Sequence, residues 1–232
     1  MLTRLLIAAN VVVYVFELVS GSVDMSGASY DTGIIVAGDL NPALVAQGEW
    51  WRVFTAAFLH AGWIHIGSNM FALYQVGTFI ELVYGRVRMA ILYVLGILGA
   101  SFACLWFAPQ QSELGASGAI FALFGALLAA GVRWGRDGRS LIQQSSGIII
   151  LNLVLGFTVL HGIVSNTAHI GGLVIGTLAG LVLFRVPRPR IVAAGEPLEA
   201  GITYESPRAI AEAQATGEAA RSVAPPHDPP QP

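Results

Sequence analysis

The sequence is poor in charge: only 11% of its 232 residues are charged, against about 25% in an ordinary soluble domain. So few charged side chains cannot cover a water-facing surface, which argues against a soluble globular enzyme. The net charge is −2 and no basic cluster is present, which argues against an ordinary nucleic-acid binder. The single cysteine, Cys104, excludes an intramolecular disulfide bond and a thiolate metal cluster.

Long apolar stretches dominate instead: 55% of the residues are hydrophobic and the mean hydropathy is +0.67. A helix that crosses a bilayer needs about 20 apolar residues. Six such runs are bounded by charges or turn signals, at about residues 3–19, 64–83, 87–107, 117–133, 147–163 and 169–185. We therefore predict an all-α polytopic membrane protein with a six-helix domain over residues 1–186 and a long outer loop at 20–63. Residues 187–232 are rich in Ala, Glu and Pro, which predicts a disordered tail.

The positive charges, all of them Arg, fall on alternate loops. With six spans, every Arg up to Arg190 except Arg52 lies on one side of the membrane. Positively charged loops stay in the cytosol, so both termini are predicted to be cytosolic. Arg4 followed by an apolar run is also typical of a secretory signal peptide, but Asn10 and Glu17 interrupt the run and no clear cleavage site follows.

Four polar side chains are predicted to share one depth in the membrane. Spans 64–83, 117–133 and 169–185 all run from outside to inside. His65 and Asn69, Ser117, and His169 lie near the outer starts of these spans. Polar groups in hydrocarbon are costly, and they are usually functional or hold helices together. The four residues are therefore a candidate site in the outer third of the bundle.

Ser117 lies in the segment Gly115-Ala116-Ser117-Gly118. Glycine on both sides permits other backbone or a substrate to approach closely. A helix that starts here offers free backbone N–H groups, which favour negative charge. A serine nucleophile beside an oxyanion hole needs these features, although Ala119 breaks the Gly-x-Ser-x-Gly elbow of soluble hydrolases. The alternative is a serine that hydrogen-bonds between helices.

Two strips of small residues predict which spans pack together. Strips with small residues every fourth position allow close helix contact in lipid. One strip contains Gly172, Gly176 and Gly180, and the other contains Gly118, Ala122, Gly125 or Ala126, and Ala129. We therefore expect span 169–185 to dock on span 117–133.

This docking would bring His169 against Ser117, with Phe121 one turn below Ser117 in a position to brace the imidazole. A histidine within hydrogen-bonding reach activates a serine that is otherwise a weak nucleophile. No carboxylate is well placed as a third member. The residues therefore predict a Ser-His dyad in which helix packing orients the histidine.

His65 and Asn69 are four residues apart and share a helix face. Both can donate hydrogen bonds to an oxyanion, or alternatively between helices. A metal site built from His60, His65, His161 and His169 is a further alternative. No carboxylate or cysteine joins these histidines, and the His-Glu-x-x-His signature is absent. We therefore expect neither a metal nor a cofactor.

Other residues are interpreted as structural. Trp51 and Arg52 anchor the outer loop, where the aromatic side chains suit the membrane interface. Glu17, near the outer end of span 3–19, reaches the membrane surface by snorkelling. Glu81 pairs with Arg86 or Arg88 at the inner end of the second span.

In their order and spacing, these residues resemble the rhomboid intramembrane serine proteases. The matching segments are Glu49-Trp50-Trp51-Arg52, Phe58-Leu59-His60, His65 to Met70, Glu81 to Gly85, Gly115 to Gly118 and Ala168 to Gly172. The ordered set covers about residues 3–185 and is specific, although each motif alone is weak. The resemblance implies that Ser117 is the nucleophile, His169 the general base, and His65 with Asn69 the oxyanion site. We expect no cytosolic domain before the first span, and the tail matches nothing in the family.

The sequence thus predicts a rhomboid-type serine endopeptidase that cleaves transmembrane proteins at or near the outer ends of their membrane segments, through an acyl-enzyme. Its partners would be these substrates and the lipid bilayer, in the plasma membrane of a prokaryote. An inactive relative that only binds membrane clients is disfavoured, because Ser117 and His169 are both present. A transporter or channel would need polar groups through the full depth of the membrane. Every Asp falls in a loop or in the tail, which excludes an intramembrane aspartyl protease.

Overall fold

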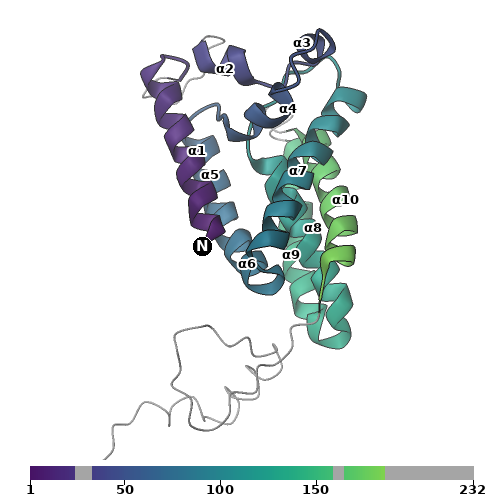
Figure 1. The fold of residues 1–232 in the computed structure, drawn as a ribbon. Helices are drawn as coiled ribbons and strands as arrows, with labels where there is room; N and C mark the ends of the chain where they lie inside the picture. Colours follow the sequence, from purple (N-terminus) through teal and green to yellow (C-terminus); the bar gives the residue numbers. More distant parts are fainter. Residues whose placement is uncertain (24–32, 159–164, 186–232) are drawn as a thin grey trace, which may run out of the picture. The chain divides into compact units, whose positions relative to one another are not determined.

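The computed structural model describes residues 1–23, 33–158 and 165–185, which form helices and loops and include an isolated bridge between Leu40 and Glu113. The predicted tail and the last residues of the predicted span 147–163 lie outside the described residues. In chain order the elements are α1 (Leu2–Val19), α2 (Gly33–Gly38), α3 (Pro42–Ala46), α4 (Arg52–Thr55), η1 (Ala56–Phe58), α5 (Trp63–Ala72), η2 (Leu73–Gly77), α6 (Thr78–Tyr84), α7 (Arg86–Phe107), α8 (Ser117–Trp134), η3 (Gly135–Gly138), α9 (Arg139–Phe157) and α10 (Asn166–Leu183) (Figure 1).

Four helical stretches within the described ranges are long and apolar enough to cross a membrane: Leu2–Val19, Arg86–Phe107, Ser117–Phe157 and Asn166–Leu183. The stretch from Ser117 to Phe157 contains both α8 and α9, which a turn at Gly135 (φ 63°) separates. Elements α5, η2 and α6 follow one another without a loop from residue 63 to residue 84, where the second span is predicted. The all-helical membrane architecture is confirmed. The count of six spans and the cytosolic position of both termini stay predictions.

The helices begin and end within three residues of the limits expected for the spans, except for the fifth. Helix α9 begins at Arg139 rather than at residue 147, and it ends at Phe157. Residues 139–146 include several polar side chains, so hydropathy alone does not mark them as part of a span. They are helical because the first turn of α9 packs against the end of α8, where Gly131 leaves room for Gly138 and Ile142.

Helix α8 lies at the centre of the bundle, because 13 of its 18 residues are buried. Helix α10 packs along it through backbone contacts that only glycine or alanine permits (Figure 1). The pairs in contact are Gly172 with Gly118, Gly176 with Ala122, and Gly180 with Ala126. From one contact pair to the next, the residue number rises by four in both helices, so the two helices run in the same direction. The predicted docking of these two spans is confirmed.

Helices α5, α8 and α10 begin at the same end of the bundle, which we call the site end. The parallel packing of α8 and α10 sets the level of two of these starts. The third start is set by His65, in the first turn of α5, which contacts Gly115 just before α8. The polar residues that the sequence placed at one depth therefore come from three neighbouring helix starts.

Helix α1 turns its polar side chains into the bundle. Its buried residues are Thr3, Asn10, Tyr14 and Glu17. The Glu81 carboxylate accepts hydrogen bonds from the Thr3 N–H at 3.0 Å and the Thr3 hydroxyl at 2.8 Å, and it pairs with Arg86 Nε at 3.3 Å, as predicted. The prediction that Glu17 snorkels to the surface is wrong, because its side chain is 0% exposed. Its carboxylate instead accepts the backbone N–H of His60 at 3.0 Å.

Candidate active site

Ser117 is the first residue of α8, and its side chain is partly exposed. The first backbone N–H groups of a helix have no intrahelical partner, and the N-cap residue of α8, Ala116, offers them no side-chain hydrogen bond. The turn before it depends on Gly115, which has a φ of 121° and donates its N–H to the Ala56 carbonyl at 2.8 Å. The serine hydroxyl therefore lies beside free N–H groups at the positive end of a helix, where negative charge is stabilised.

His169 lies in the first turns of α10 and is only 4% exposed. The Ser165 hydroxyl caps this helix by accepting the Ala168 N–H at 3.2 Å. The Phe121 ring stacks on the imidazole, with ring centroids 4.0 Å apart and an interplanar angle of 8°, as the sequence predicts. The Nδ1 atom of His169 is buried without a hydrogen-bond partner among the described residues. The ring is therefore oriented by packing and not by a carboxylate.

Close packing of α8 and α10 brings the regions around Ser117 and His169 together. A Cβ atom on Gly118, the residue after Ser117, would lie 3.5 Å from the carbonyl oxygen of Ala168, the residue before His169. No helix separates the two residues. In the part of the chain that the structure describes, no hydrogen bond joins their side chains. Such bonds are often long without substrate and shorten when it binds.

His65 presents a hydrogen-bond donor to the start of α8. Its Nδ1 atom accepts the Ala61 N–H at 3.2 Å. A neutral imidazole that accepts at Nδ1 carries its proton on Nε2. The Nε2 edge faces Gly115, where an added Cβ would lie 2.8 Å from both Cε1 and Nε2. Asn69 is buried one turn further along α5 and donates its Nδ2 to the His65 carbonyl at 3.0 Å.

Glu17 and His60 also lie at the site end, although sequence patterns alone give neither of them a role in the catalytic set. The His60 side chain is fully buried, and its ring meets that of His65 edge-on with centroids 5.1 Å apart. The Nδ1 atom of His60 donates to the Phe58 carbonyl at 3.2 Å. Burial, and then the neighbouring His65, lower the pKa of His60 to about 3, so this ring is neutral at pH 7. A sequence signal could have found Glu17: the polar residues Thr3, Asn10 and Glu17 are spaced so that they share one face of α1, and this face is buried.

The metal alternative finds no support in the described ranges. No three His, Cys, Asp or Glu side chains there lie close enough together to hold an ion. His161, which this alternative included, lies outside the described residues.

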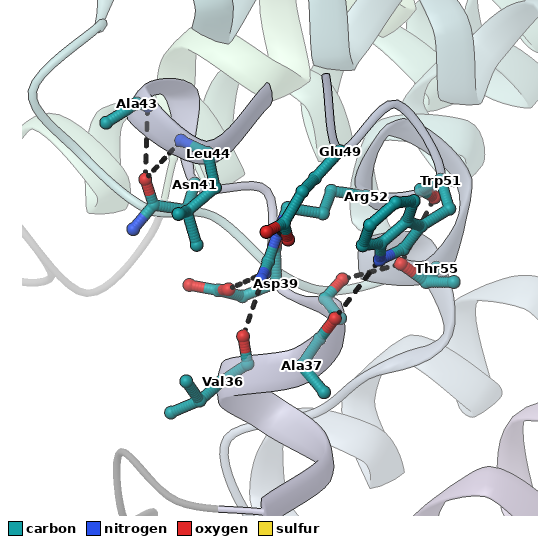
Figure 2. Close-up of polar contacts among 11 residues, drawn as sticks. Val36, Ala37, Asp39, Asn41, Ala43, Leu44, Glu49, Trp51, Arg52 and Thr55 are labelled. Carbon is teal, nitrogen blue, oxygen red and sulfur yellow. Dashed lines mark hydrogen bonds and ion pairs between the residues drawn. The ribbon is translucent and has the colours of Figure 1, made fainter. Parts of the chain in front are cut away.

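Arg52 holds the loop that leads to the site end (Figure 2). Its side chain is 4% exposed and forms ion pairs with Asp39 and Glu49, each at 2.7 Å. The Trp51 ring N–H donates to the Ala37 carbonyl at 3.3 Å. The predicted anchoring of the loop by residues 51 and 52 is confirmed. The loop continues to residue 56, whose carbonyl holds the turn before α8.

Comparison with known proteins identifies relatives of one kind. A family model described as the Rhomboid domain matches residues 47–186. The chain is 39% identical to rhomboid protease GluP of Bacillus subtilis, over 69% of this chain and 31% of that protein. It is 36% identical to RHOMBOID-like protein 5 of Arabidopsis thaliana, over 65% of this chain and 50% of that protein. It is 29% identical to rhomboid protease AarA of Providencia stuartii, over 83% of this chain and 75% of that protein. The chain thus spans about a third to a half of the first two relatives.

Proposed function

We propose that this chain, which belongs to the rhomboid family, is an active intramembrane serine endopeptidase that uses a Ser117–His169 dyad. Members of this family are intramembrane serine proteases, and some rhomboid-like proteins are inactive. The question for this chain is therefore whether its own residues can perform the reaction. One observation carries the proposal: the glycine contacts between α8 and α10 place the regions around Ser117 and His169 side by side at the site end.

In the proposed reaction, the Ser117 hydroxyl attacks the carbonyl carbon of the scissile peptide bond while His169 takes the hydroxyl proton. The tetrahedral intermediate then collapses, and the imidazolium gives that proton to the leaving amine. This leaves an acyl-enzyme on Ser117. Water attacks the ester with His169 again acting as base. The ester bond to Ser117 then breaks, the imidazolium returns the proton to the Ser117 oxygen, and the product leaves with its new carboxyl group. The stacking of Phe121 on His169 supports a dyad rather than a triad, and so does the lack of a partner for Nδ1 among the described residues.

The negative charge on the intermediate needs donors that are already in place. We assign this role to His65 and Asn69, helped by the free N–H groups at the start of α8. The hydrogen bond from Ala61 to His65 Nδ1 supports the assignment, because it leaves the Nε2 proton available. Gly115 allows this donor edge to lie against the turn that precedes Ser117.

The membrane arrangement that we propose has six spans, with both termini in the cytosol and the site end toward the extracytoplasmic side of a prokaryotic plasma membrane. Water would then reach the dyad from outside. The substrates would be membrane proteins, cut in or near the outer ends of their transmembrane segments. A helical carbonyl is hydrogen-bonded within its own helix, so the substrate must unwind locally. Helix-destabilising residues near the cut should therefore favour cleavage.

The direct test is labelling of the purified full-length protein with a fluorophosphonate, together with cleavage of a model single-span substrate in proteoliposomes. We expect wild-type protein to be labelled at Ser117 and to cleave the substrate. Ser117→Ala should lose both activities while keeping its thermal unfolding temperature. His169→Ala should lose both as well, with a lower unfolding temperature because it removes a buried ring that stacks on Phe121. If wild type and Ser117→Ala cleave equally, or if neither cleaves, the protease assignment fails and a client-binding role takes its place.

A further inference from the structure

We infer that Glu17 of α1 is a positioning residue for the oxyanion donor, acting on His65 through the backbone of residues 60 and 61. This inference rests on the proposed function, because it assigns Glu17 to the proposed oxyanion site. Glu17 lies at the far end of α1, and neither sequence motif nor charge pairing connects it with the dyad. The connection is made by three consecutive contacts.

The first contact is made by the Glu17 carboxylate, which is completely buried. Its Oε1 atom accepts the backbone N–H of His60 at 3.0 Å. A buried carboxylate in a membrane helix is costly and persists only where it has a definite task. Here it fixes the main chain of the short segment that joins η1 to α5.

The second contact follows one residue later. The Ala61 N–H donates to His65 Nδ1 at 3.2 Å. The bond to Glu17 holds the planar peptide unit between residues 59 and 60. Only the φ and ψ angles of His60 separate this unit from the Ala61 N–H, so holding it restricts the direction of the next N–H. A well-aimed donor at Nδ1 keeps the His65 proton on Nε2. In the other tautomer Nε2 would be an acceptor, and its lone pair would repel an oxyanion.

The third contact restrains the ring of His65. The His60 ring, fixed by its Nδ1 bond to the Phe58 carbonyl at 3.2 Å, meets it edge-on. Glu17 holds the backbone that carries the His60 ring. It thus contributes to the orientation of His65 as well as to its tautomer. The bond to His60 uses Oε1, whereas Oε2 has no hydrogen-bond partner among the described residues. An acceptor of the right length is therefore required at position 17, and a charge is not.

Three substitutions separate length from charge. Glu17→Gln keeps the acceptor and removes the charge. Glu17→Asp keeps the charge but shortens the side chain by one methylene, and Glu17→Leu removes both. Losing one oxyanion donor costs about 10²–10³-fold in kcat. We expect the Asp and Leu variants to lose about 10–100-fold in kcat with little change in KM, because a misdirected His65 retains part of its effect. The Gln variant should keep most of the wild-type kcat.

A double-mutant cycle with His65→Ala decides whether the effect passes through His65. In that background Glu17→Leu should cost less than about threefold, since the residue it positions is gone. Additive losses, or a Gln variant as impaired as the Asp variant, would overturn the inference. Histidine ¹⁵N NMR gives an independent readout: His65 should be protonated on Nε2 in wild type and in the Gln variant, and should show mixed tautomers in the Asp variant. Wild-type protein and Ser117→Ala are measured beside these variants. If wild type is no more active than Ser117→Ala, the proposed function fails. If wild type is active but the Glu17 variants do not behave as expected, only this inference fails.

Discussion

Replacing Gly172 by alanine tests the contact between α8 and α10 that holds the dyad together. The new Cβ would overlap the carbonyl group of Gly118, lying 2.9 Å from its carbon as well as too close to its oxygen. That group belongs to the backbone of a buried helix and cannot rotate away. Since ordinary contact begins near 3.4 Å, α10 must withdraw from α8 by on the order of 1 Å.

Two energies follow from this displacement. Overpacking a close contact lowers the free energy of unfolding by about 1–3 kcal/mol. The better helix propensity of alanine offsets up to about 1 kcal/mol of this loss. We therefore expect a net destabilisation of about 1–2 kcal/mol. Gly172 lies one turn from His169, and a shift of about 1 Å in a catalytic group costs about 10²-fold in rate. This corresponds to about 2.7 kcal/mol in the activation free energy.

The assay compares kcat for a model transmembrane substrate with thermal unfolding in the same detergent. Gly147→Ala in α9 is the matched control, because nothing lies within 4 Å of the added Cβ. It should leave activity unchanged and stability equal or higher. Gly180→Ala should destabilise, since its Cβ would lie 2.7 Å from Ala126 Cα, but it should lose less activity because it lies two turns further from His169. Wild-type cleavage by Gly172→Ala, or equal losses of kcat in Gly172→Ala and Gly180→Ala at equal stability, would refute the reasoning.

Two more predictions concern the site end. Gly115→Ala should lower kcat at least tenfold, because its φ of 121° strains an L residue and its Cβ would lie 2.8 Å from the His65 ring. Gly67→Ala, which meets open space in α5, is its control, and equal activity of the two variants contradicts the prediction. The second prediction concerns His60, whose pKa falls from 6.5 in the unfolded state to about 3 in the folded state. Below pH 6.5 the unfolded state binds more protons than the folded state. The protein therefore loses stability as the pH falls from 6.5 toward 3. At pH 5 the loss of unfolding free energy is about 2 kcal/mol. His60→Asn should remove this part of the pH dependence, as measured by unfolding at pH 7 and pH 5. An unchanged pH dependence would contradict the pKa shift.

The packing of α10 on α8 was predictable because small residues at every fourth position define a single helix face. That face fixes the neighbour and the register without knowledge of the rest of the fold. The stacking of Phe121 on His169 follows from the same register. The start of α9 was not predictable from hydropathy, which marks the apolar part of a helix and not its end.

Glu17 shows why the site was only partly predictable. Judged alone, a carboxylate near the end of a span is expected to reach water. Thr3, Asn10 and Glu17, however, are spaced by seven residues, so they form a polar stripe on one face of α1. Such a stripe predicts a face turned toward protein. The hydrogen-bond partners of this stripe, His60 and Glu81, lie on distant parts of the chain. The sequence around α1 therefore does not identify them.

The stripe on α1 also has a consequence for the order in which the protein is made. The hydrogen-bond partner of Glu17 is synthesised 43 residues later, and that of Thr3 is synthesised 78 residues later. Helix α1 is therefore translated before the groups that satisfy its polar face. Until His60 and Glu81 have been translated and have docked on α1, its carboxylate and hydroxyl lack these two partners. Maturation of the site end is thus tied to a docking event between α1 and segments that are translated after it.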